Sequence, residues 1–207
     1  MKALVLHGSP RRGGNSDTLV EHFLKGLNES SNCTVNEFFT NDLNIKSCQM
    51  CESCSRPPDY KCIIKDDMYK IYSAFREADI VVFATPMLWG YMTAQLKTVL
   101  DRMEAIASEK YLRGKTFVVI ITYRHHYETT VAFFKRAFAD YFGVKLHTIL
   151  YCCVEDKTSG REAHVSTCEE KLSEAHELGR SLGKQLGSRT VAKTQLSDTA
   201  WGEVGHD

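Results

Sequence analysis

The chain has no excess of charge of either sign and no long apolar run. Its 26 lysines and arginines balance its 26 aspartates and glutamates, so no net field attracts nucleic acid or an anionic membrane. No stretch approaches the roughly 18 apolar residues that a membrane-spanning helix needs, and the apolar run at 3–6 is too short for a signal-peptide core. We therefore expect a cytoplasmic protein with neither nucleic acid nor a membrane as a partner.

Two common nucleotide-binding signatures and any internal repeat are also missing. In the Gly/Ser-rich loop at 8–16, Asn15 follows Gly14 where a Walker A loop needs lysine, and the GxGxxG pattern is absent. A helix is predicted to follow, and its first turn offers unpaired backbone N–H groups and the positive end of a dipole. Side-chain donors surround this point at Ser9, Arg11, Asn15, Ser16 and Thr18. The loop suits a phosphate monoester, although plain turn chemistry is an alternative explanation of its composition.

Apolar strands and amphipathic helices alternate along the chain. Strands are predicted at 3–6, 34–39, 80–84, 117–121 and 146–150, and Ser166 with Glu169 forms a capping-box pattern before the last helix. This order predicts an α/β fold with a five-stranded parallel sheet, strand order 2-1-3-4-5. The loops at 8–16 and 85–91 then meet at the topological switch point, with 122–128 beside them, so a ligand is expected there.

We expect one domain at 1–186 and a polar C-terminal tail at 187–207. The tail has Trp201 as its one large anchor, and would be flexible or pack on a partner subunit. Residues 44–65 form a cysteine-rich insertion without periodicity, and a connection of that length is usually functional.

Eight cysteines are present, which in a reducing compartment argues for metal binding or redox work rather than a disulfide framework. Two, two and seven residues separate the clustered cysteines, which are Cys48, Cys51, Cys54 and Cys62. This spacing resembles iron–sulfur ligation more than the paired knuckles of zinc sites. Zinc, or free thiols in a structural loop, are the alternatives. The other cysteines are expected to be small packing residues, with a redox role for Cys152-Cys153 as the alternative.

Several motifs together carry a family resemblance. They are Gly8-Ser9-Pro10-Arg11 with Gly14-Asn15-Ser16, Ala84-Thr85-Pro86-Met87-Leu88-Trp89-Gly90, and the segment QLKTVLDR at 95–102. With them, about residues 1–185 resemble the NAD(P)H-dependent FMN reductase family of the flavodoxin-like superfamily. The cysteine run, followed by Lys65-Asp66-Asp67-Met68, is similar to the iron-sulfur flavoprotein branch, which carries a four-cysteine motif for a 4Fe-4S cluster beside FMN.

The resemblance implies a flavodoxin-like three-layer sandwich and an FMN-dependent oxidoreductase that passes electrons from NADH or NADPH through the flavin to an acceptor. It implies phosphate contacts from Ser9, Arg11, Asn15, Ser16 and Thr18, flavin contacts from Pro86, Met87, Leu88, Trp89, Gly90, Thr122 and Tyr123, and cluster ligands Cys48, Cys51, Cys54 and Cys62. The third loop departs from the pattern, because Thr122-Tyr123-Arg124-His125-His126-Tyr127 replaces a glycine-rich turn. Its bulk would cap the flavin, supply cations for a substrate or narrow access to the flavin.

No catalytic acid or base is assigned, because the flavin supplies the chemistry in this interpretation. One alternative is an iron-sulfur electron carrier that exchanges electrons with a ferredoxin-like partner. Another is a non-catalytic flavodoxin-fold binding protein with a structural metal loop. The resemblance also implies a homodimer or homotetramer, and a small molecule or redox protein as electron acceptor.

Overall fold

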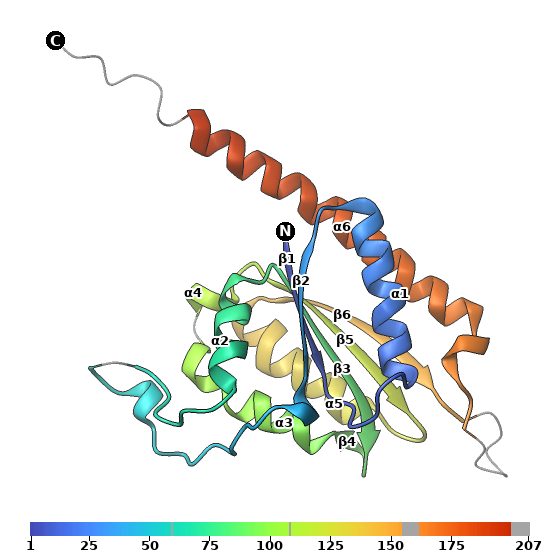
Figure 1. Ribbon diagram of the computed structural model, residues 1–207, viewed down its shortest axis with the longest axis horizontal. Helices are drawn as coiled ribbons and strands as arrows, with labels where there is room; N and C mark the ends of the chain where they lie inside the picture. The colour runs from blue at the N-terminus through green and yellow to red at the C-terminus, as the bar shows by residue number, and fades with distance from the viewer. Residues whose placement is uncertain (59, 108, 155–161, 200–207) are drawn as a thin grey trace.

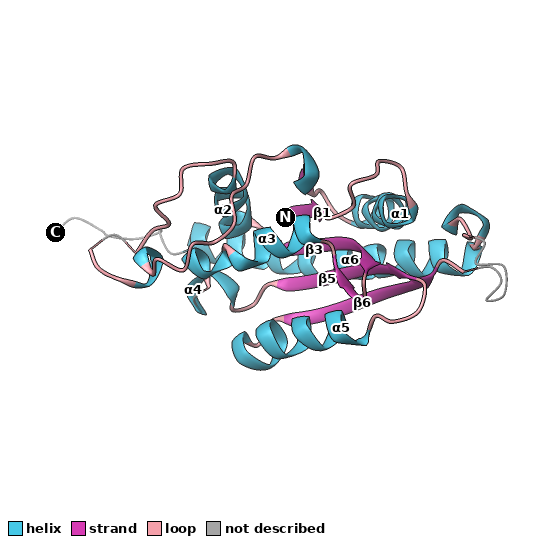
Figure 2. Ribbon diagram, turned by 90° about the horizontal axis from the view of Figure 1, so that it is seen from below, coloured by secondary structure: helices cyan, strands magenta, loops and turns pink. Residues whose placement is uncertain are grey.

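A parallel sheet forms the middle layer of the protein, as the computed structural model shows (Figures 1 and 2). The structure describes residues 1–58, 60–107, 109–154 and 162–199, without the side chains of 109, 110 and 189–199. The strands are β1 (Lys2–His7), β2 (Thr34–Phe39), β3 (Ile80–Leu88), β4 (Tyr91–Met92), β5 (Thr116–Tyr123) and β6 (Lys145–Cys152). The long strands lie in the order β2-β1-β3-β5-β6, all parallel. The predicted flavodoxin-like order 2-1-3-4-5 is confirmed, and short β4 adds an antiparallel hairpin to the end of β3.

Helices cover both faces of the sheet and complete three layers (Figure 2). They are α1 (Asn15–Ser30), α2 (Met68–Glu77), α3 (Ala94–Asp101), α4 (Glu109–Leu112), α5 (Glu128–Phe134) and α6 (Glu169–Thr199). Alternate residues of β3 enter different cores, because successive side chains of a strand point to opposite faces. Val81 and Phe83 pack with α2, α3 and α5, while Ile80 and Val82 pack with α1 and α6. A strand covered on both sides is therefore apolar throughout.

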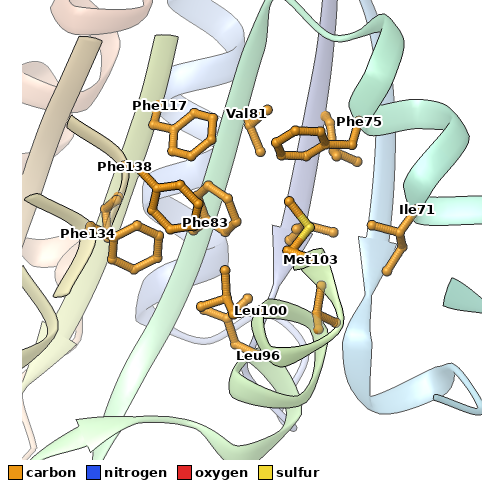
Figure 3. Packing of buried hydrophobic residues seen from close by; sticks show 14 of the residues in the cluster. Ile71, Phe75, Val81, Phe83, Leu96, Leu100, Met103, Phe117, Phe134 and Phe138 are labelled. Atoms are coloured by element: carbon orange, nitrogen blue, oxygen red, sulfur yellow. The ribbon is translucent and has the colours of Figure 1, made fainter. Parts of the chain in front are cut away.

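Aromatic rings fill the core beneath α2, α3 and α5 (Figure 3). The ring centroid of Phe83 lies 5.0 Å from that of Phe117 and 4.9 Å from that of Phe134, and Phe75 meets Phe117 edge-on. Such tilted and edge-to-face contacts add to the free energy gained from apolar burial. They fix β3 and β5, two of the three strands whose ends carry predicted site loops.

Glycines let α1 and α6 pack backbone to backbone. A Cβ atom on Gly26 would lie 2.0 Å from the carbonyl oxygen of His176, and one on Gly179 would lie 2.0 Å from that of Phe23. Gly183 sits one turn further along α6, where a Cβ atom would lie 2.1 Å from the Ser30 hydroxyl. Any larger residue at these positions would force the two helices apart.

Helix α6 departs from expectation at both ends. It begins at Glu169, while Ser166 lies in a preceding 3₁₀ turn (Val165–Thr167) and its hydroxyl contacts Nδ1 of His164 at 2.8 Å. It continues to Thr199, so the first part of the expected tail at 187–207 is helical and extends beyond the sheet in Figure 1. Trp201 lies outside the described residues. Among the described helices, none combines the length and apolar character needed to cross a bilayer.

Candidate functional site

A cavity of about 490 Å³ opens at the carboxyl ends of β1, β3 and β5. Its lining comes from three predicted loops and from one segment that was not predicted. The lining residues are Ser9, Pro10, Arg11, Gly14, Asn15, Ser16, Pro86, Met87, Leu88, Trp89, Thr122, Tyr123, Arg124, Cys153 and Glu162. The expected meeting of the loops at the topological switch point is thus confirmed.

The first wall of the cavity is the start of α1. Gly14 is the N-cap and contributes no side chain, so backbone N–H groups of the first turn are open toward the cavity. Ser16 is 3% exposed and lines the cavity, and no hydrogen bond joins its hydroxyl to another described residue. Ser9 accepts a hydrogen bond from the Arg11 N–H at 3.1 Å, which closes the turn. These groups form a cradle for an anion.

Two predicted phosphate ligands are placed differently from expectation. Asn15 lines the cavity, but its side chain donates to the carbonyl oxygen of Ala163 at 3.0 Å and accepts from the N–H of Val165 at 2.8 Å. Its amide therefore ties α1 to the 163–165 segment. Thr18 is not among the lining residues, and its hydroxyl donates to the carbonyl oxygen of Gly14 at 3.2 Å.

The second wall is the hairpin between β3 and β4. Pro86, Met87, Leu88 and Trp89 line the cavity. Gly90 is not part of the lining; it shares the turn with Trp89, with φ of +75° and +51° respectively. A tryptophan in the left-handed region is strained, and its indole is fully exposed. The hairpin tip thus presents a broad apolar surface at the mouth of the cavity.

The third wall follows β5. Thr122 and Tyr123 line the cavity as predicted, and the ring of Tyr123 packs on that of Tyr127 with centroids 4.6 Å apart. Burial is the main cause that raises the pKa of Tyr123, so its phenol stays neutral at physiological pH. His125 and His126 are exposed and not among the lining residues.

Five lining residues were not individually assigned: Pro10, Gly14 and Arg124 lie within the predicted loops, whereas Cys153 and Glu162 come from the segment beyond β6. Glu162 reaches the cavity through an antiparallel bridge to Val154 and pairs with Arg124 at 3.4 Å. Nothing in the sequence periodicity signals that bridge. Cys153 directly follows a predicted strand, and this position was the one indication in the sequence that it lies at the ligand-binding edge of the sheet.

Comparison with known proteins identifies the family. The model of the NADPH-dependent FMN reductase family matches residues 1–145. The chain belongs to this family.

Several curated relatives of the chain are named iron-sulfur flavoproteins. One from Archaeoglobus fulgidus is 33% identical over 123 residues, covering 59% of this chain and 54% of the relative. Another, MJ0731 from Methanocaldococcus jannaschii, is 36% identical over 122 residues, covering 58% and 60%. The chain thus spans little more than half of the length of these relatives. The match confirms the resemblance to the iron-sulfur flavoprotein branch.

Solved structures confirm the fold. The NAD(P)H:quinone oxidoreductase of Methanothermobacter marburgensis superposes with a TM-score of 0.63 at 20% identity, covering 88% of this chain and 96% of that one. RosB, with a bound 8-demethyl-8-formylriboflavin-5'-phosphate intermediate, gives a TM-score of 0.68 at 13% identity, covering 100% and 90%.

The cavity fits the FMN that the family name implies. The first turn of α1 and the unpaired Ser16 hydroxyl offer donors for the phosphate, with the Arg11 cation beside them. The apolar hairpin wall lies across the same cavity, where a flat ring system can pack. A volume of about 490 Å³ also falls within the range of small-molecule sites.

The four clustered cysteines are not assembled into a ligand set. Cys48 and Cys51 are exposed, Cys54 and Cys62 are half-buried, and no three metal-binding side chains gather anywhere in the described part of the chain. Hydrogen bonds of the described residues in 47–61 stay within that segment. The donor chemistry suits iron, but this geometry does not fit a cluster, because no contact among the described residues draws the thiols together.

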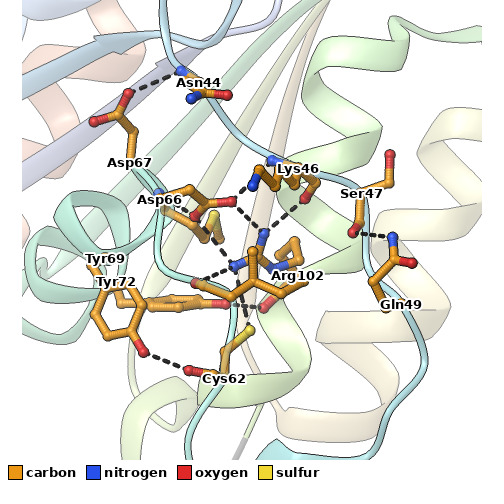
Figure 4. Close-up of polar contacts among 12 residues, drawn as sticks. Asn44, Lys46, Ser47, Gln49, Cys62, Asp66, Asp67, Tyr69, Tyr72 and Arg102 are labelled. Carbon is orange, nitrogen blue, oxygen red and sulfur yellow. Dashed lines mark hydrogen bonds and ion pairs between the residues drawn. The ribbon is translucent and has the colours of Figure 1, made fainter.

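A buried ion pair fixes the two ends of the cysteine segment (Figure 4). Arg102, 2% exposed, donates to Asp66 at 2.8 Å, to the carbonyl oxygen of Lys46 at 2.7 Å and to Sγ of Cys62 at 3.3 Å. Burial alone raises the pKa of Asp66, but hydrogen bonds from Arg102 and from backbone N–H groups outweigh it and hold that pKa below its ordinary value. The segment is therefore clamped where it leaves and rejoins the fold.

Proposed function

We propose that the protein is an FMN-dependent oxidoreductase that uses NADH or NADPH and passes the electrons to an acceptor. The observation that carries the proposal is one cavity that combines an anion cradle at the start of α1 with the apolar wall of the β3–β4 hairpin. Membership of the FMN reductase family supports it. Bound FMN supplies the redox chemistry, which is hydride acceptance and electron release.

The protein's own residues bind, orient and shield in this proposal. The first turn of α1 and Ser16 hold the phosphate, and Arg11 adds a cation beside it. The hairpin residues Met87 and Leu88 form the apolar wall for the ring, while Tyr123 restricts water from the β5 side. We assign no proton-transferring residue. The bulky third loop narrows access to the cavity rather than opening it as a glycine-rich turn does.

A second candidate is an iron-sulfur flavoprotein that serves as an electron carrier for a ferredoxin-like partner. The spacing of Cys48, Cys51, Cys54 and Cys62 supports it, as does the printed name of the curated relatives. The dispersed thiols of the described structure count against it, so no electron-transfer step through a cluster is derived. A non-catalytic binding protein is the weaker alternative, given the family. We further expect a cytoplasmic homodimer or homotetramer.

Anaerobic purification with FMN, iron and zinc quantified per chain tests these candidates. The proposed enzyme contains FMN, shows a flavin spectrum and oxidises NADH or NADPH with a quinone or free flavin as acceptor. About four irons per chain together with FMN would favour the iron-sulfur carrier. Protein that binds no FMN under any of these conditions would overturn both redox candidates.

A further inference from the structure

A buried histidine lies between two carboxylates beneath the phosphate loop. His7 is the last residue of β1 and is 2% exposed. Its Nδ1 lies 2.9 Å from Oδ1 of Asp17, and its Nε2 lies 3.0 Å from Oε2 of Glu37. Its ring is stacked on Phe39, with centroids 4.0 Å apart. Both ring nitrogens are thus held by an acceptor, which favours the imidazolium form.

Asp17 connects this histidine directly to the phosphate loop. Its second oxygen, Oδ2, accepts the N–H of Gly13 at 2.9 Å, and Gly13 has a φ of +63°. Asp17 is 4% exposed and follows Ser16, which lines the cavity at the proposed phosphate position. One carboxylate therefore sets both the loop conformation and the orientation of the imidazole.

The charge of Asp17 creates a conflict that His7 resolves. A buried carboxylate in the first turn of α1 interacts favourably with the positive end of the helix dipole. It also repels a phosphate dianion at the same helix end. The charged groups around His7 are Asp17 from α1 and Glu37 from β2, with Arg12 above Phe39 and paired to Asp42. The β3 neighbour, Ala84, is uncharged. Burial lowers the pKa of His7, but hydrogen bonds to both carboxylates outweigh it and raise that pKa above 6.5.

We propose that His7 is a positioning residue of the FMN phosphate site. The proton on His7 orients the Asp17 carboxylate, which in turn holds the N–H of Gly13. The charge of the imidazolium also balances the charge of that carboxylate. The inference rests on the proposed FMN site and adds one property to it. Binding of the phosphate group is coupled to the proton on His7. Riboflavin, which has the same ring but no phosphate, is not coupled to that proton.

The sign of the pH effect follows from this coupling. The protonated state of His7 binds FMN more tightly, so the affinity is highest below the pKa of His7 and falls as the pH rises through it. Phosphate monoesters lose their second proton at a pKa of about 6, so measurements from neutral pH upward keep FMN a dianion. The affinity for riboflavin stays level over the same range.

The test is a fluorescence titration of apoprotein with FMN and with riboflavin, from neutral to alkaline pH. We expect the wild-type affinity for FMN to fall by on the order of tenfold, a common size for coupling between two sites. His7→Gln keeps a donor for Asp17 but cannot titrate, so it binds FMN weakly at every pH. His22→Gln changes a histidine on α1 that makes no contact with this network, so it keeps the wild-type profile.

The NMR titration of the His7 ring in wild-type protein covers the case in which the variant fails to fold. We expect FMN to move that titration to higher pH and riboflavin to leave it in place. Parallel loss of FMN and riboflavin affinity, or a His7 ring that FMN does not affect, would overturn the inference alone. Protein that binds neither flavin at any pH would overturn the proposed function and the inference with it.

Discussion

The phosphate loop at 8–14 and the cysteine segment at 44–65 are both connections that leave the same sheet, yet the fold holds them differently. Gly8 donates to the carbonyl oxygen of Ala84 at 2.7 Å and accepts from the Thr93 hydroxyl at 2.7 Å, and Gly13 is bound by Asp17. Buried partners therefore hold the phosphate loop at Gly8 and Gly13, and the contact between Ser9 and Arg11 closes the turn between them. Among the described residues, hydrogen bonds tie the cysteine segment to the fold only near its ends, its turn at 53–55 lies against the turn at 103–106, and no three of its thiols gather at one point.

This difference indicates two ways of making a binding site. A short loop held at closely spaced points presents its donors before the ligand arrives, so little binding free energy is lost to ordering. A long segment that is hydrogen-bonded to the fold only near its ends has to be ordered by whatever binds it, and the cost is taken from the binding free energy. The phosphate site is thus preorganised, while any metal site in the cysteine segment is formed on binding.

The largest expected effect tests the buried ion pair between Arg102 and Asp66, which holds the two ends of the cysteine segment. Arg102→Gln leaves the Asp66 carboxylate buried without its partner, together with the carbonyl oxygen of Lys46. Breaking a buried ion pair from one side typically costs about 3 to 5 kcal/mol. We expect a loss of this size in urea unfolding of the full chain, and faster alkylation of Cys62 in the native protein, because its half-buried thiol becomes accessible when this end of the segment is released.

Lys97→Gln is the matched control for this experiment. It removes a cation from α3 that pairs with Asp101 at the surface, where such pairs contribute about 0 to 1 kcal/mol. Equal losses of unfolding free energy in the two variants would show that the Arg102–Asp66 pair contributes little.

The stabilisation by the Arg102–Asp66 pair should also weaken in acid, which urea unfolding of the wild-type protein at a series of pH values would measure. Because the pKa of Asp66 is lowered by folding, its contribution is present above the unfolded pKa and is lost as pH falls through the folded one.

The next effect tests the preorganised loop by comparing two hydroxyls on one helix. Ser16→Ala removes the hydroxyl of a buried residue that lines the cavity. A hydrogen bond to a charged group contributes about 1.5 to 3 kcal/mol, so FMN affinity should fall by about tenfold or more. The affinity for riboflavin should not change. Isothermal titration of apoprotein with both flavins measures the two effects.

Thr18→Val is the control, because the Thr18 hydroxyl is bound to the carbonyl oxygen of Gly14 and not directed at the cavity. We expect its FMN affinity to stay within about twofold of wild type, since only a local helix contact changes. A large loss of FMN affinity in Thr18→Val would show that Thr18 does contact the phosphate, as the sequence predicted. A small loss of FMN affinity in Ser16→Ala would show that Ser16 does not contact it.

The sheet and the meeting of the three loops could be predicted because both follow from local pattern and chain handedness. Apolar strands that alternate with helices leave few permitted topologies. The pattern could not predict local departures. Ser166 and Glu169 fit a capping box, but Ser166 is part of a separate turn. The helix that follows β5 changes after Phe134 into a π-helical turn over Lys135–Asp140.

The site was predicted less completely than the sheet, because side-chain direction depends on tertiary contacts. Asn15 was assigned to the phosphate, but its amide matches the backbone of Ala163 and Val165, which approach from far along the chain. Glu162 entered the cavity through the same segment. Composition marks a residue as a donor or acceptor; only the packed structure decides which partner it meets.

The smallest expected effect concerns Glu162, which carries a negative charge into an otherwise cationic edge of the preorganised site. Its Oε2 lies 3.9 Å from Arg11 and 3.4 Å from Arg124, all on half-exposed or exposed side chains. An anionic ligand has to compete with it for Arg11. Exposed pairs of this kind contribute about 0 to 1 kcal/mol, so Glu162→Gln should raise FMN affinity by no more than about fivefold.

Salt separates this electrostatic effect from a change in shape. At 1 M ionic strength the screening length is about 3 Å, so the gain in Glu162→Gln should vanish there. Glu77→Gln removes the same charge at the opposite end of β1, where Glu77 pairs with Lys2, and should leave FMN binding unchanged at any salt. Weaker FMN binding in Glu162→Gln would mean that Glu162 holds Arg11 and Arg124 in place for the ligand. The preorganisation of the phosphate loop would then extend to the segment beyond β6.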